Sequence, residues 1–271
     1  MTNTTKRVLS ALILTPLAVA LILSQNSFYV EIVLGFVSLG MAWEYQRIAF
    51  RGSVVGRFLF IASSVELYWV VLQKETFLLE AVSFFLFLSM TIHIFLGHLK
   101  EEMELGDVFY SCGSWVMGAL YVSVFPACLV LIYDRPLGYQ WVIFVFSCIW
   151  MTDTGAWFFG KRYGKTKLSH RMSPKKTWEG TLAGTVIGVV SGVLVWKEFS
   201  LEGNFVIVTA AALLVSVFGQ VGDLFESLLK RTYGVKDSSQ LIPGHGGLLD
   251  RMDSAIFAAP LLFILLRSGI L

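Results

Sequence analysis

The sequence predicts an all-α integral membrane protein with about nine transmembrane helices and a cytoplasmic N-terminus. Hydrophobic residues make up 56% of the 271 residues and charged residues only 15%, whereas soluble domains carry about 25% charged residues. Apolar runs of roughly 20 residues, the length that crosses the hydrocarbon core of a bilayer, recur along the whole chain. Because lipid offers the backbone no hydrogen bonds, runs of this length fold as helices.

Nine apolar runs define the predicted spans. The first resembles a signal peptide because Lys6 and Arg7 precede it, but no small-x-small cleavage site follows and further spans do. We therefore expect this run to be retained as the first helix. The runs lie near residues 8–25, 28–49, 55–73, 77–97, 107–132, 139–160, 178–197, 204–229 and 251–271.

The positions of lysine and arginine predict the orientation. With the N-terminus in the cytoplasm, 17 of the 21 Lys and Arg residues fall on the cytoplasmic side and 4 on the other, the bias that the positive-inside rule describes. In a bacterium this places the protein in the inner membrane with its active site facing the cytoplasm. The net charge of +2 gives no indication of a nucleic-acid partner.

Motif density divides the chain into two parts. Residues 1–100 are expected to form N-terminal membrane helices with few motif residues, and residues 101–271 a catalytic membrane region with cytoplasmic loops 161–177 and 230–250.

One glycine in every four residues of the span 178–197 predicts close packing on another helix, within the chain or between subunits. These glycines are Gly180, Gly184, Gly188 and Gly192.

Acidic residues at the cytoplasmic ends of three spans are candidates for metal binding. Carboxylates inside membrane spans are costly and therefore mark a cavity or a partner, and carboxylate oxygens favour Mg²⁺ over zinc. Two structural alternatives stay open. One is an ion pair between Glu226 and Lys230, and the other is capping of the N-terminus of the last span by Asp250 and Asp253. The residues are Asp153, then Asp223, Glu226, Ser227 and Lys230 on one helical face, then Asp250 and Asp253 one turn apart.

Two further segments are suited to phosphate groups. The loop 161–176 holds seven Lys or Arg residues and no acidic residue. Attraction to anionic lipid headgroups explains part of this charge, but amines and hydroxyls at a helix N-terminus also suit phosphates. A glycine-rich turn before the last span lets the backbone approach an anion closely. The candidates are Ser173, Lys175, Lys176 and Thr177 in the loop and His245, Gly246 and Gly247 in the turn.

Carboxylates for a divalent metal and cations for phosphates, gathered at one membrane face, indicate phosphoryl or nucleotidyl transfer. No Walker A loop and no GxSxG motif is present in the sequence. The residues alone therefore predict a metal-dependent enzyme that joins a membrane-embedded phosphate to a water-soluble partner bearing phosphates.

Two stretches resemble a known family. The pattern in residues 227–253 resembles the signature of the phosphatidate cytidylyltransferase (CDP-diacylglycerol synthase) family, with each fixed position occupied at the right spacing. It consists of Ser227, Lys230, Arg231, Lys236, Asp237, Pro243, His245, Gly246, Gly247, Asp250, Arg251 and Asp253. A second stretch is similar to another segment of that family, through Asp153, Gly160, Gly164, Lys165, Lys167, Leu168, Ser173, Pro174, Lys176, Thr177, Glu179 and Gly180.

This resemblance implies the reaction of CTP with phosphatidate to give CDP-diacylglycerol and pyrophosphate, a nucleotidyl transfer in phospholipid biosynthesis. It also implies a homodimer in the bilayer and dependence on Mg²⁺, with a monovalent cation such as K⁺ as a further candidate. Asp223, Asp250 and Asp253 are then expected to hold the metal. The other expected catalytic residues are Lys230, Arg231, Lys236, His245 and Arg251, and the expected substrate-binding residues are Asp153, Ser173, Lys175, Lys176, Thr177, Ser227, Gly246 and Gly247.

Three alternative functions share parts of this pattern. A CTP-dependent polyprenol kinase would use a similar cavity but transfer the γ-phosphate. A transporter would explain buried carboxylates, but not two motif-rich segments on one side of the membrane without paired broken helices. An alcohol phosphatidyltransferase would need a spaced Asp-Gly-Ala-Arg motif that the sequence lacks.

Overall fold

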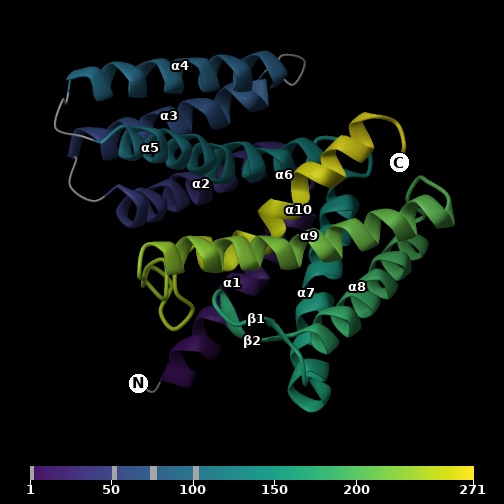
Figure 1. Cartoon of the computed structure of the whole chain (residues 1–271). Helices are drawn as coiled ribbons and strands as arrows, with labels where there is room; N and C mark the ends of the chain where they lie inside the picture. Colours follow the sequence, from purple (N-terminus) through teal and green to yellow (C-terminus); the bar gives the residue numbers. More distant parts are fainter. Residues whose placement is uncertain (1–2, 51–53, 74–77, 100–103) are drawn as a thin grey trace. The chain divides into compact units, whose positions relative to one another are not determined.

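The computed structural model describes residues 3–50, 54–73, 78–99 and 104–271, and helices dominate these ranges (Figure 1). This confirms the helical class predicted from composition. The elements are α1 (Asn3–Leu23), α2 (Ser27–Ala49), α3 (Val54–Gln73), α4 (Leu78–Leu99), α5 (Leu105–Ala119), a π-helical segment (Leu120–Val124), α6 (Phe125–Tyr133), α7 (Gly138–Tyr163), β1 (Lys167–Ser169), β2 (Ser173–Thr177), α8 (Trp178–Phe199), α9 (Phe205–Thr232) and α10 (Leu249–Arg267).

Within the described ranges, six helical stretches are long and apolar enough to cross a membrane, which makes the chain a multi-pass membrane protein. They are Ser27–Ala49, Val54–Gln73, Leu105–Tyr133, Gly138–Tyr163, Trp178–Phe199 and Phe205–Thr232. α1 and α4 contain shorter apolar parts, Leu12–Leu23 and Val82–Phe95. The count of nine spans and the cytoplasmic N-terminus therefore stay predictions.

The structure does not describe five of the positively charged side chains on which the predicted orientation depends. Arg51, Lys74 and Lys100 lie outside the described residues, as do the side chains of Lys6 and Arg7. The orientation thus continues to depend on the sequence.

The chain forms two compact units, one of residues 1–31 with 128–271 and the other of residues 32–127. α1 therefore belongs with the C-terminal helices, and the division does not coincide with the boundary near residue 100 that motif density suggests. The polar segments of the sequence pattern all lie in the first unit.

Close packing of α8 on α7 is the main helix contact of the first unit, and glycines permit it (Figure 1). A Cβ atom at Gly180 would lie 2.6 Å from the Ala156 carbonyl oxygen, and one at Gly192 would lie 2.6 Å from Cys148 Sγ. A Cβ atom at Gly184 would overlap Thr152. The glycine stripe thus packs on a neighbouring helix of the same chain, which confirms the packing role predicted for it.

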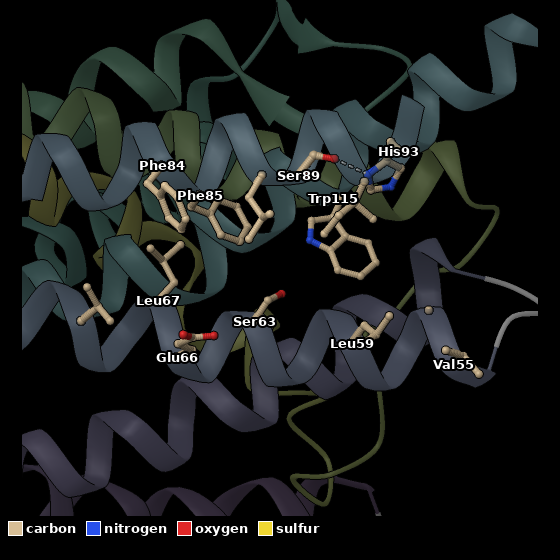
Figure 2. A pocket seen from close by; sticks show the side chains of 14 residues that line it. Val55, Leu59, Ser63, Glu66, Leu67, Phe84, Phe85, Ser89, His93 and Trp115 are labelled. Atoms are coloured by element: carbon tan, nitrogen blue, oxygen red, sulfur yellow. Dashed lines mark hydrogen bonds between the residues drawn. The ribbon is translucent and has the colours of Figure 1, made fainter. Parts of the chain in front are cut away.

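The second unit has an aromatic core and an apolar cavity. Tyr45, Phe60 and Trp115 are in ring contact, with Tyr45 stacked on Phe60 at a centroid distance of 5.3 Å. Figure 2 shows the cavity, of about 460 Å³, with side chains of α3 on one side and of α4 on the other. Glu66 is among its lining residues, but none of the site residues predicted from the sequence is.

Candidate functional site

A β-hairpin between α7 and α8 gathers the basic residues of the segment 161–177. β1 and β2 pair antiparallel, with Lys167 opposite Thr177 and Ser169 opposite Ser173. The sequence predicts a loop here, because neither strand is long or apolar enough to be recognised. The hairpin brings lysines from both ends of the segment to one place.

Hydrogen bonds from the start of α8 hold the hairpin in position. The Glu179 carboxylate accepts hydrogen bonds from the backbone N–H groups of Lys165 and Thr166, both at 3.1 Å. Thr177 caps α8, since its Oγ1 accepts a hydrogen bond from the Gly180 N–H at 3.2 Å. The segment that follows α7 is therefore folded back onto the N-terminus of α8.

The hairpin and α7, α8 and α9 enclose a cavity of about 610 Å³, the basic cavity. Four lysines line it, together with two carboxylates and the amide of Gln220. The charged residues are Lys161, Lys167, Lys175, Lys176, Asp153 and Asp223. This concentration of ammonium groups, next to a helix N-terminus, suits a ligand with several phosphate charges.

Three carboxylates from three helices form an acidic cluster, Asp153, Asp223 and Asp253, beside the basic cavity. Lys176 Nζ lies 2.7 Å from Asp223 Oδ2. Asp153 and Asp253 both lie close enough to Asp223 to be repelled by it, while Lys176 and Arg251 offset the negative charge around Asp153. Carboxylates grouped in this way need a cation nearby to stay ionised.

A second charged cluster joins α9 to α10. Lys230 Nζ lies 2.5 Å from Glu226 Oε2 and 2.6 Å from Asp250 Oδ1. The side chains are 13% exposed for Lys230, 2% for Glu226 and 8% for Asp250. The ion pair between Glu226 and Lys230 that the sequence leaves open is thus present, and Lys230 extends it to the next helix.

Asp250 also organises the loop that precedes its helix. Its Oδ2 accepts hydrogen bonds from the Ser238 N–H at 3.0 Å, the Ser238 hydroxyl at 2.7 Å and the Gly247 N–H at 2.8 Å. Burial alone would raise the pKa of the Asp250 carboxyl, but its hydrogen bonds hold that pKa well below the ordinary value. Asp250 is therefore an ionised anchor for the segment 233–248.

The glycine-rich turn places His245 at a second cavity. The Ile242 N–H donates to the Gly246 carbonyl oxygen at 2.8 Å, and the His245 N–H donates to the Ile242 carbonyl oxygen at 2.9 Å. Gly244 and Gly246 have φ values of 79° and 83°, which side chains with a Cβ rarely adopt. The turn and the start of α10, together with Asp237, Ser239 and Gln240, line a cavity of about 790 Å³, the loop cavity.

The structure divides most of the predicted residues between the two cavities. Asp153, Lys175, Lys176, Thr177 and Asp223 line the basic cavity, and His245, Gly246, Asp250 and Arg251 line the loop cavity. The guanidinium of Arg251 is close enough to interact with Asp153. The positive charge of Arg251, at the loop cavity, therefore acts on Asp153 in the basic cavity.

Seven predicted residues do not line either cavity among the described residues; they are Lys230, Arg231, Lys236, Ser173, Ser227, Gly247 and Asp253. Arg231 and Lys236 are exposed, whereas Ser173 and Ser227 are half-buried. Sequence reasoning did not select Ser238, which donates twice to Asp250, or Gln220, which lines the basic cavity. A polar amide inside an apolar span was the available signal for Gln220, whereas nothing local marked Ser238.

Comparison with known proteins assigns the chain to a family. The sequence model of the cytidylyltransferase family matches residues 5–268, nearly the whole chain. The chain belongs to the cytidylyltransferase family. Both motif-bearing segments lie inside the matched range, as does α1 apart from its first two residues.

Relatives in the cytidylyltransferase family are named phosphatidate cytidylyltransferase. The chain is 38% identical to the one from Pseudomonas aeruginosa over 267 residues, 96% of each chain. It is 41% identical to the one from Brucella suis over 152 residues, 55% of this chain and 56% of the relative. A Staphylococcus epidermidis relative is 39% identical over 158 residues, 58% of this chain and 60% of the relative. The matches to the Brucella and Staphylococcus relatives thus span little more than half of their length.

Proposed function

We propose that the protein is a phosphatidate cytidylyltransferase, which converts CTP and phosphatidate into CDP-diacylglycerol and pyrophosphate in phospholipid biosynthesis. The observation that carries this proposal is the similarity to the Pseudomonas aeruginosa phosphatidate cytidylyltransferase over 96% of both chains. The charge distribution agrees with it, because both substrates carry phosphates and the basic cavity offers four lysines.

The residues of the two cavities would hold the phosphates of both substrates. Lys175, Lys176 and Lys167 supply positive charge for a triphosphate in the basic cavity. Arg251 and His245 supply donors in the loop cavity. Since the charge of Arg251 also acts on Asp153, we place a phosphate held by Arg251 near the acidic cluster where the chemistry is proposed to occur.

The chemical step proposed is an in-line displacement. A phosphatidate oxygen attacks the α-phosphorus of CTP, a new P–O bond forms, and the bond to the β-phosphate oxygen breaks with its electrons leaving on pyrophosphate. The nucleophile is already an anion at neutral pH, so none of the side chains has to act as a general base. The task of the lysines and of Arg251 is to position the phosphates and neutralise charge.

The residues of the site fit a divalent metal ion. The acidic cluster supplies the hard oxygen donors that Mg²⁺ prefers, and Lys176 and Arg251 offset part of the repulsion between its carboxylates. The described residues contain no ready-made group of three such ligands. We propose Asp223 and Asp253 as the principal ligands, since both oxygens of Asp250, the third candidate, already accept hydrogen bonds. When bound, Mg²⁺ would neutralise charge on the reacting phosphates.

The membrane setting completes the proposal. The positive-inside bias supports a cytoplasmic site in the inner membrane of a bacterium, where soluble CTP and membrane-embedded phosphatidate can meet. The family resemblance supports a homodimer and a K⁺ ion beside Mg²⁺.

The test uses purified protein in detergent with phosphatidate, Mg²⁺ and CTP labelled either in the cytosine ring or in the γ-phosphate. We expect the cytosine label in the chloroform-soluble product and the γ-label in aqueous pyrophosphate. Transfer of the γ-label alone to lipid would instead identify a lipid kinase.

A further inference from the structure

The side-chain amide of Gln220 is hydrogen-bonded at one end and open at the other. Its Nε2 donates to Thr185 Oγ1 of α8 at 2.9 Å and lies 3.4 Å from the Ser216 carbonyl oxygen of α9. The Thr185 hydroxyl donates to the Thr181 carbonyl oxygen at 2.9 Å. Gln220 is only 6% exposed, yet it lines the basic cavity. One buried polar group therefore joins the contact between α8 and α9 to that cavity.

The two carbonyl oxygens determine which end of the amide faces the cavity. A carbonyl oxygen only accepts hydrogen bonds, so the Thr181 oxygen needs the Thr185 hydroxyl proton and the Ser216 oxygen needs an amide proton. If the amide were turned around, Thr185 would give its proton to Gln220. Each of the two carbonyl oxygens would then meet another oxygen with no proton between them. The NH₂ group therefore points to Thr185 and Ser216, and the amide oxygen Oε1 points away from them.

Gln220 Oε1 is an unused hydrogen-bond acceptor. None of the described residues donates to it. Unlike the buried hydroxyl oxygens of Thr152 and Ser216, it is not cut off from the cavity that Gln220 lines. The lysines of the basic cavity supply donors for phosphates, whereas this oxygen needs a ligand that itself carries an N–H or O–H group.

The nucleotide is the proposed substrate whose base carries such a donor. Phosphatidate presents phosphate and ester oxygens, which accept hydrogen bonds. Cytosine carries an amino group at the position where uracil has an acceptor oxygen. Gln220 precedes Asp223 by three residues on α9, a rise of about 4.5 Å, so a nucleotide whose reacting phosphate lies at Asp223 can reach Gln220 with its nucleoside end. Trp157 lines the same cavity and offers an aromatic surface for a base.

We propose that Gln220 is a specificity-determining residue, whose Oε1 accepts a hydrogen bond from the 4-amino group of cytosine in the basic cavity. Thr185 is the positioning residue that holds the amide in the required orientation. The inference rests on the proposed function for the identity of the nucleotide.

Replacement of the amide tests the preference for cytosine. Gln220→Leu has a similar size but no acceptor, so the ratio of kcat/KM for CTP to kcat/KM for UTP should fall about tenfold, the effect of one hydrogen bond of ordinary strength. Gln73→Leu is the matched control, because Gln73 is exposed at the end of α3, and it should leave the ratio within about twofold of the wild type. An unchanged ratio in Gln220→Leu would overturn the proposal.

An analogue of CTP with hydrogen in place of the 4-amino group locates the contact on the base. The wild type should use CTP about tenfold better than this analogue. Gln220→Leu should use the two within about twofold of each other, because the partner of the amino group is gone. If Gln220→Leu kept the preference of the wild type, its contact would lie elsewhere on the nucleotide and the proposal would be wrong.

Two threonine variants test how the amide is held. Thr185→Val removes the hydroxyl and lets the amide turn, so the preference for CTP over the analogue should fall about threefold. Thr185→Ser keeps the hydroxyl and should retain the preference within about twofold. The same preference in both variants would refute the positioning role of Thr185.

Equilibrium dialysis of labelled CTP and UTP against the purified protein in detergent measures the preference without turnover. We expect the wild type to bind CTP about tenfold more tightly than UTP, and Gln220→Leu to bind the two within about twofold of each other. Preferential CTP binding by a wild type that makes no CDP-diacylglycerol would refute the proposed function alone. Equal binding of both nucleotides by the wild type, or binding of neither, would overturn the role of Gln220.

Discussion

Lys230 is the residue on which the buried charges of α9 and α10 depend. It lies between Glu226 and Asp250, and all three side chains are largely removed from solvent. Buried ion pairs contribute little compared with apolar packing, but removing one partner leaves the other charge without compensation. The cost of losing Lys230 is therefore expected in stability as well as in activity.

Replacing Lys230 with Met should lower the free energy of unfolding by about 3–5 kcal/mol, because two buried carboxylates lose their shared cation. Denaturant unfolding in detergent measures the change. Lys236→Met is the matched control, since Lys236 is exposed and the change there should stay within about 0.5 kcal/mol. Equal effects of the two substitutions would show that the buried cluster does not stabilise the fold.

Asp250→Asn should reduce turnover at least ~100-fold, because the variant keeps the shape but removes the charge that Lys230, Ser238 and Gly247 neutralise or hydrogen-bond. Incorporation of labelled CTP into lipid measures it. Asp237→Asn, at an exposed position lining the same cavity, should be milder. Near-wild-type activity of Asp250→Asn at limiting Mg²⁺ would contradict the role given to Asp250.

At the residue scale, sequence reasoning selects the residues that chemistry alone marks. The sequence selects Asp223 and Lys176 because a charged side chain at a membrane face is costly unless it has a partner. In the structure, Lys176 Nζ lies 2.7 Å from Asp223 Oδ2. Ser238 could not be found, because a serine is common in both helices and loops. Its two hydrogen bonds to Asp250 arise only when folding brings the loop to the start of α10.

At the scale of elements, the contact between α7 and α8 depends on residues that lack a side chain. Gly184→Leu should destabilise the protein by about 1–3 kcal/mol or more, since its Cβ would already overlap Thr152 and approach Ala156 Cβ at 2.8 Å. The melting temperature in detergent measures this. Gly113→Leu in α5 is the control, because nothing lies within 4 Å of a Cβ there. An unchanged melting temperature for Gly184→Leu would refute the packing role.

Long helices were predictable because a single run of about 20 apolar residues in lipid satisfies its own backbone hydrogen bonds as a helix. The run predicted at 139–160 corresponds to α7, and the run at 178–197 to α8. The hairpin β1–β2 was not predictable in the same way. Its strands have three and five residues, and it is held by contacts such as Glu179 with the Thr166 N–H rather than by a hydrophobic pattern.

At the scale of the whole molecule, the orientation in the bilayer is the prediction to test. A cysteine at Arg171, in a variant whose Cys112, Cys128 and Cys148 are replaced by Ala, should react with an impermeant thiol reagent only after cells are opened, because positive loops remain inside. A cysteine at Glu202, on the opposite predicted side, should react in intact cells. Labelling of position 171 in sealed cells would reverse the topology.

The first unit is interrupted in sequence by the second, since residues 1–31 pack with residues 128–271. A ribosome adds about 5–20 residues per second, so Ser10 is synthesised roughly 12–47 s before His245, which is 235 residues downstream. During that interval α1 has not yet met all of the residues 128–271 with which it packs in the finished chain. The contact between α1 and the glycine-rich turn, where Ser10 Oγ lies 2.6 Å from His245 Nδ1, can therefore form only after nearly the whole chain has been synthesised.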